Sequence, residues 1–109
     1  MSRTLTATEL KPLLTGDRIT VLDVRRQNDF AADPVMLPGA LRCQPEDIDT
    51  WSRQLRSDQD IVLYCARGGS VSNSVLDTLL ARQLKARYIE GGIVAWKEAG
   101  GATVAESNN

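Results

Sequence analysis

Residues 60–72 read DIVLYCARGGSVS, and this stretch decides the fold. Its four consecutive apolar residues, 61–64, are typical of a strand buried on both faces, as in a parallel sheet. Cys65 ends that strand, and a tight glycine-containing loop leads from it to Ser70. The apolar residues that follow at helical spacing predict a helix to about Leu84. They are Val71, Val75, Leu76, Leu79 and Leu80.

Strand and helix alternate along the rest of the chain. Such alternation predicts an α/β domain with three layers, in which helices cover both faces of a parallel sheet. We expect one domain over residues 1–104 and a frayed tail over 105–109. The other expected elements are a short edge strand at 4–5, a helix opened by a Thr6–Glu9 capping box and running to about Leu14 with Pro12 inside it, a strand at 19–24, an irregular loop at 25–37 with one helical turn near 29–31, a strand at 40–43, a helix beginning at Pro45, a strand at 86–90 and a helix at 93–99.

The composition excludes several classes of function. The chain has 109 residues, with thirteen basic side chains against fourteen acidic ones, so nothing predicts nucleic acid or a membrane as partner. Residues 1–8 are polar and do not resemble a secretory signal, which favours the cytoplasm and reduced thiols.

Histidine is absent, and the chain has two cysteines, Cys43 and Cys65. A zinc or iron site normally needs three or four clustered ligands, so we expect no metal. The same absence removes catalysis by a Cys–His pair or a Ser–His–Asp triad. Any chemistry must therefore use cysteine, arginine, carboxylates, serine and backbone amides.

The loop after Cys65 is the candidate site. Ligands of open parallel sheets bind beyond the carboxyl ends of the strands, where Cys65 is expected to lie. A helix N-terminus, a curled run of glycine amides and the charge of Arg67 would all favour a thiolate and an anion beside it. We expect Cys65 to be the nucleophile unless it is an inert buried thiol. The expected anion-binding residues are Ala66, Arg67, Gly68, Gly69, Ser70, Val71 and Ser72.

Four motifs together resemble the rhodanese family. They are VLDVR at 21–25, LPGA at 37–40, the Tyr64–Cys65 pair with Gly68, and EGG at 90–92 with Ala95, Trp96 and Gly100. The resemblance implies a five-stranded parallel sheet, with the strand of Asp23 beside that of Cys65. It also implies a sulfurtransferase in which Cys65 takes sulfane sulfur from thiosulfate or a persulfide donor. The resulting persulfide passes its sulfur to cyanide or a thiol, without a cofactor, and a protein can be the donor or the acceptor.

The chain departs from that family at two places. Met36 stands where the family often has a histidine, and Ser70 stands where many members have an arginine. Two alternative functions follow. One is a cysteine phosphatase or arsenate reductase on the same scaffold, although Val71 replaces the arginine that a phosphatase needs six residues after its nucleophile. The other is a non-catalytic or sulfur-carrier binding module.

Other polar residues have two interpretations each. Asp23 and Arg25 could position substrate, but a structural hydrogen-bond network under the loop is favoured. Cys43 could act as a resolving thiol, but a small residue filling the sheet surface is favoured. Ser70 and Ser72 could simply cap the helix.

Overall fold

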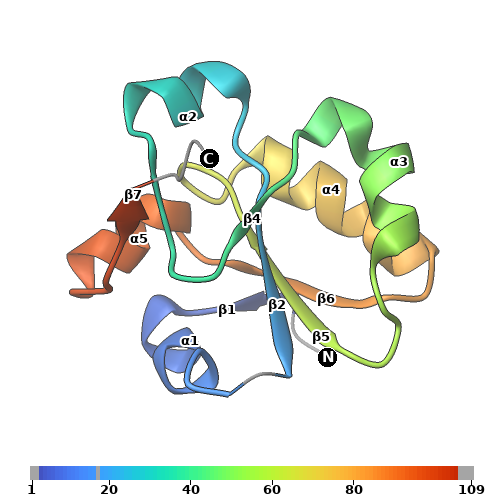
Figure 1. The fold of residues 1–109 in the computed structure, drawn as a ribbon, viewed down its shortest axis with the longest axis horizontal. Coiled ribbons are helices and arrows are strands. Elements are labelled where there is room, and N and C mark those ends of the chain that lie inside the picture. Colours follow the sequence, from blue (N-terminus) through green and yellow to red (C-terminus); the bar gives the residue numbers. More distant parts are fainter. Residues whose placement is uncertain (1–2, 17, 106–109) are drawn as a thin grey trace.

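A computed structural model of the chain describes residues 3–16 and 18–105. Its main sheet has five parallel strands in the order β1-β6-β5-β2-β4, as Figure 1 shows. These strands are β1 (Thr4–Leu5), β2 (Ile19–Asp23), β4 (Leu41–Arg42), β5 (Asp60–Tyr64) and β6 (Lys85–Ile89). A separate antiparallel pair joins β3 (Val35–Met36) to β7 (Val104–Ala105). The expected five-stranded α/β fold is thereby confirmed.

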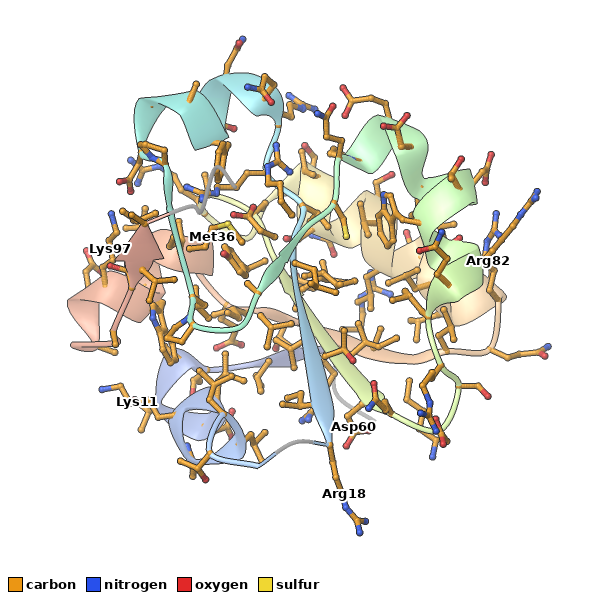
Figure 2. The ribbon with its side chains drawn as sticks, viewed as in Figure 1. Lys11, Arg18, Met36, Asp60, Arg82 and Lys97 are labelled. Carbon is orange, nitrogen blue, oxygen red and sulfur yellow. The ribbon has the colours of Figure 1, made fainter. Side chains whose placement is uncertain are left out.

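Helices cover both faces of the sheet. They are α1 (Ala7–Leu13), α2 (Gln27–Ala32), α3 (Ile48–Trp51) between the 3₁₀ turns η1 (Pro45–Asp47) and η2 (Ser52–Gln54), α4 (Ser70–Ala81) and α5 (Gly92–Glu98). In Figure 1, α1 and α5 lie on one side of the sheet and α3 and α4 on the other. Each pair is linked by a side-chain contact: Lys11 of α1 donates to the Ala99 carbonyl after α5, and Arg82 after α4 pairs with Asp49 of α3. Figure 2 labels Lys11 and Arg82. No helix in the described part of the chain is long and apolar enough to cross a bilayer.

The central strand β5 divides the core in two. Val62 and Tyr64 pack on the side of α1 and α5, whereas Ile61, Leu63 and Cys65 pack on the side of α4. This alternation is the two-residue period of a strand, and both faces are apolar because both are covered. It also determines that the thiol of Cys65 lies on the α4 face.

The N-terminal helix begins as its sequence predicts. The Thr6 hydroxyl accepts a 3.0 Å hydrogen bond from the Glu9 amide, and the Glu9 carboxylate accepts one of 2.8 Å from the Thr6 amide. This reciprocal capping box satisfies two amides that a helix start would otherwise leave unpaired. Pro12 lies in the last turn of α1, which ends at Leu13.

Several element boundaries differ from the expected ones. The helix α4 ends at Ala81 rather than near Leu84, because Gln83 takes a positive φ of 65° and turns the chain into β6. The expected single turn near 29–31 is the six-residue helix α2. The expected strand at 40–43 is paired over Leu41–Arg42, and the helix after Pro45 is interrupted by 3₁₀ turns.

The first residue of the expected frayed tail, Ala105, pairs with Val35 in the β3–β7 ladder. The remaining tail residues, 106–109, lie outside the described residues.

Candidate functional site

Cys65 follows directly after β5, at the carboxyl rim of the sheet. It is a free thiol with 6% of its surface exposed, and it belongs to the cluster that includes Val24 and Val75. Its position on the central strand fixes the backbone, while its position just past the strand end leaves the sulfur at the rim. This is where parallel sheets place their ligands.

The loop from Cys65 to α4 has the predicted strand, glycine turn and helix. Gly68 has a φ of +73°, which glycine adopts without strain. A Cβ at that position would also lie 2.9 Å from the Gly91 amide nitrogen. Gly69 then forms the N-cap of α4, whose first residue is Ser70. Glycine at position 68 is therefore required both by its conformation and by the close approach of the neighbouring turn.

That neighbouring turn holds the loop in place, and sequence reasoning did not foresee it. The amides of Ile93 and Val94, at the start of α5, donate to the carbonyls of Cys65 and Ala66 over 3.0 and 3.2 Å. A Cβ on Gly92 would lie 2.4 Å from the Cys65 carbonyl oxygen. The EGG motif at 90–92 was the available signal, because its two glycines allow the turn to approach the cysteine loop closely and the clamping amides follow directly after it.

The backbone amides of the loop lack hydrogen-bond partners within the described residues. Residues 67–72 make no hydrogen bond through their N–H groups to any described part of the chain. The first amides of a helix lack helical partners and carry partial positive charge. Their convergence on the sulfur of Cys65 stays a prediction.

The polar side chains of Arg67 and Ser72 in the loop also lack hydrogen-bond partners among the described residues. Arg67 is exposed, and no described residue forms an ion pair or side-chain hydrogen bond with it. Ser72 is fully buried, yet its hydroxyl finds no partner among the described residues. Neither Ser70 nor Ser72 caps α4, so the capping interpretation is wrong. Val71 is half-buried and packs against the cluster that contains Cys65.

The buried ion pair of Asp23 and Arg25 lies at the end of the adjacent strand β2. Arg25 donates to both carboxylate oxygens of Asp23, over 2.7–3.1 Å, and also to the carbonyls of Asp33 and Val35. Its guanidinium lies 5.0 Å from the ring centre of Phe30 on α2. Burial alone would lower the pKa of Arg25, but the hydrogen bonds and charge of Asp23 outweigh it and raise that pKa.

Tyr64 joins this network from the last position of β5. Its hydroxyl donates to Asp23 over 3.1 Å and accepts from the Leu37 amide over 3.2 Å. Burial, together with the Asp23 carboxylate, raises the pKa of Tyr64. These polar groups satisfy one another beneath the loop, which agrees with the structural interpretation of Asp23 and Arg25 rather than with substrate binding.

Cys43 lies just past β4, two strands away from Cys65. Burial raises the pKa of its thiol to about 11, although Arg42 opposes this shift. Adjacent strands are about 4.8 Å apart, so the two cysteine backbones are separated by roughly 10 Å, beyond the reach of a disulfide. Both features favour the packing role for Cys43 over that of a resolving thiol.

Comparison with known proteins agrees with this architecture. A rhodanese-related protein from Thermoplasma volcanium is 25% identical, with a TM-score of 0.83 over 96% of this chain and 100% of that one. A rhodanese-like domain protein from Staphylococcus aureus is 26% identical, with a TM-score of 0.81 over 97% and 100%. A Rhodopseudomonas palustris protein, described as of unknown function and a possible tyrosine phosphatase, is 26% identical, with a TM-score of 0.79 over 94% and 84%.

Curated proteins gave no match. The family model for the rhodanese-like domain, by contrast, matches residues 6–99, from the capping box of α1 to the end of α5. That range contains the cysteine loop, the EGG clamp and the Asp23–Arg25 network, and the chain therefore belongs to the rhodanese-like domain family.

Proposed function

We propose that this protein is a sulfurtransferase that carries sulfane sulfur as a persulfide on Cys65. One observation carries the proposal: the thiol lies at the sheet rim, directly before a loop and helix start whose backbone amides have no partner in the described chain. Unpaired amides at a helix N-terminus favour an anion, whether a thiolate, a persulfide or the sulfonate end of a donor. A reducing cytoplasm would keep Cys65 free for this reaction.

The chemistry needs only the cysteine and the loop. The Cys65 thiolate attacks the outer sulfur of thiosulfate, the sulfur–sulfur bond breaks, and sulfite leaves with the bonding pair. Cys65 then carries a persulfide anion. An acceptor such as cyanide attacks the outer sulfur, leaves as thiocyanate and returns the electron pair to the thiolate.

The loop supplies electrostatic stabilisation in this scheme. The negative charge moves from the cysteine sulfur to the outer sulfur and back, and preorganised amide donors would stabilise it at both positions. Arg67 is exposed on the same loop, and its positive charge would attract the anionic donor. The remaining loop residues, Ala66, Gly68, Gly69, Ser70, Val71 and Ser72, would shape the space around the outer sulfur.

Intact mass tests the proposal directly. Incubation with thiosulfate followed by removal of excess reagent should add one sulfur atom to the protein, and cyanide should remove it. The variant Cys65→Ala should gain none, whereas Cys43→Ser should gain one. Sulfur addition that survives Cys65→Ala would refute the assignment.

A phosphatase is the second candidate, since one similar structure is described as a possible tyrosine phosphatase. The residue six positions after Cys65 argues against it. Val71 is half-buried in the apolar cluster and has no group that could bind phosphate. We expect negligible hydrolysis of an aryl phosphate, and efficient hydrolysis that is lost in Cys65→Ser would reverse the order of the two candidates.

A further inference from the structure

The sheet face that carries α1 is left uncovered at its amino end. Ile19, Asp60 and Arg87 project onto this face, because each lies two residues before a strand residue of the core cluster beneath α1. The helix α1 ends at Leu13, and Ile19 and Arg87 stay half-buried while Asp60 is exposed. On the opposite face their strand neighbours Ile61 and Ala86 are buried in the cluster on the α4 side. The amino end is therefore covered on one face only.

The uncovered end forms an open depression of about 360 Å³ beside the last turn of α1. Pro12, Leu13 and Ile19 supply its apolar wall. Leu13 is 41% exposed, although most large apolar side chains in the described part of the chain are buried. Sites for small molecules usually measure about 300–1,000 Å³ and combine apolar walls with a few polar groups, so the depression suits a small organic ligand.

Three charged side chains surround the apolar wall: Arg18, Asp60 and Arg87. None of them forms an ion pair or a side-chain hydrogen bond with another residue in the ranges 3–16 and 18–105. Arg18 extends into solvent in Figure 2, whereas Arg87 is half-buried. A partly buried guanidinium without a partner gains a charged hydrogen bond when a carboxylate binds to it. Arg87 is therefore the cation on which a ligand would be held.

Asp60 limits how much negative charge the depression accepts. It lies on the strand beside that of Arg87, and its register partner on β6 is Lys85, two residues before Arg87. A carboxylate so close to the guanidinium repels a second negative charge on the ligand. This favours a singly charged carboxylate over a phosphate or a dicarboxylate.

The depression is separate from the thiol. Asp60 begins β5 and Cys65 follows its end, so five residues divide them along one strand. At a rise of about 3.3 Å per residue, the two backbones are about 16 Å apart. A ligand at the amino end leaves the cysteine loop free.

We propose that this depression is a second ligand site, which binds a small monocarboxylate with a short apolar body. The carboxylate pairs with Arg87, and the apolar body contacts Leu13 and Ile19. Binding is non-covalent and does not depend on the sulfurtransferase function, because the site includes no part of the cysteine loop.

The test is an NMR titration of the full chain with a matched pair of probes, 4-methylpentanoate and its neutral amide, 4-methylpentanamide. At constant pH and ionic strength, the carboxylate should shift the backbone amides of Leu13, Gly16, Asp60 and Arg87. The neutral amide has the same shape without the charge and should produce much smaller shifts at these positions.

Variants then assign the charge. Arg87→Met keeps an unbranched apolar stem and should raise the Kd for 4-methylpentanoate about tenfold, as expected for the loss of a charged hydrogen bond. Arg87→Lys should restore part of that loss. Asp60→Asn removes the repulsion and should lower the Kd about twofold, the size of an exposed charge interaction. Arg67→Met is the matched control, because Arg67 is an exposed arginine at the other end of the sheet, and it should leave the Kd unchanged.

The remaining outcomes overturn the proposal. Equal shifts with the neutral amide, or a Kd that Arg87→Met leaves unchanged, would show that Arg87 holds no carboxylate. Shifts confined to residues 66–72 would place the anion at the cysteine loop, and an absence of shifts would remove the site altogether. Since no sulfur transfer is measured, failure of this site and failure of the proposed function remain distinguishable.

Discussion

Two polar regions lie side by side at the carboxyl rim of the sheet, and they differ in how their groups are satisfied. The Asp23–Arg25–Tyr64 network ends β2 and β5, is buried, and pairs its groups with one another and with nearby carbonyls and amides. The cysteine loop has free amides, an exposed and unpaired Arg67, and a buried Ser72 hydroxyl without a partner in the described residues.

This difference supports a structural role for the network and is the basis for the functional role proposed for the loop. Burying a polar group is costly unless it finds a partner, so a saturated network stabilises the fold and has little left for a ligand. An unsaturated loop at the same rim gains its missing partners when an anion binds. The two regions should therefore respond in opposite ways to mutation.

The largest expected effect is the loss of sulfur transfer when the cysteine of the loop is replaced. Cys65→Ala should reduce sulfur transfer from thiosulfate to cyanide to background, because the other cysteine, Cys43, lies two strands away and burial raises the pKa of its thiol to about 11. The free energy of unfolding should change by only about 1 kcal/mol, as for a typical single substitution. Thiocyanate formation and urea denaturation measure the two quantities. Residual activity near the wild-type value would contradict the functional role proposed for the cysteine loop.

The second largest effect is a loss of stability when the Asp23–Arg25–Tyr64 network is broken. Arg25→Met leaves the buried Asp23 carboxylate without its positively charged partner, so the free energy of unfolding should fall by about 3–5 kcal/mol. That is a large part of the total stability of an ordinary domain. Denaturation by urea, followed by circular dichroism, provides the measurement.

Arg26→Ala is the matched control for Arg25→Met. Its side chain is adjacent in sequence but exposed and unpaired, so its effect on stability should stay within about 0.5 kcal/mol. Equal destabilisation by the two variants would show that the Asp23 network is not the structural unit that its contacts suggest.

A smaller effect separates Arg67 from other surface charges. Arg67→Ala should raise the KM for thiosulfate several-fold, because one charged contact to the anionic donor is lost, while stability stays unchanged. Arg18→Ala, at the far end of the sheet, should leave KM unaltered. Initial rates at varied thiosulfate concentration decide between this result and a merely solvated Arg67, for which both variants would match the wild type.

The last prediction concerns the response of stability to alkaline pH, which depends on the burial of Cys43 and Tyr64. The pKa of Cys43 is raised to about 11 and that of Tyr64 is also raised, whereas the unfolded chain has values near 8.5 and 10. Between about pH 8.5 and 11 the unfolded state loses protons that the folded state keeps, so the free energy of unfolding falls as pH rises. Cys43→Ser should make this fall shallower in urea denaturation across that range. An unchanged slope would contradict the assigned environment of Cys43.

The sequence predicts the parallel sheet and the cysteine loop because both leave strong local patterns. The apolar run of β5 indicates burial on both faces, and the capping box of Thr6 and Glu9 marks a helix start. Four motifs in order were sufficient to indicate the family before any contact was known.

Other features leave no such pattern. The helix α2 buries one residue, Phe30, and its N-cap Arg26 makes no side-chain cap, so neither periodicity nor capping reveals it. Gln83, just after α4, adopts a positive φ that is usually found at glycine or asparagine. The contact of α5 with the Cys65 loop joins segments that are distant in sequence. The EGG motif alone does not indicate which segment it will pack against.

That clamp has a consequence for the order in which the protein is made. Ribosomal synthesis delivers β5 and Cys65 well before Ile93 and Val94, whose amides hold the Cys65 and Ala66 carbonyls. A nascent chain that has not yet reached α5 therefore carries the thiol without the support that sets its loop. Residues 92–94 complete this support, so the proposed sulfur chemistry would have to wait until nearly the whole domain has been translated.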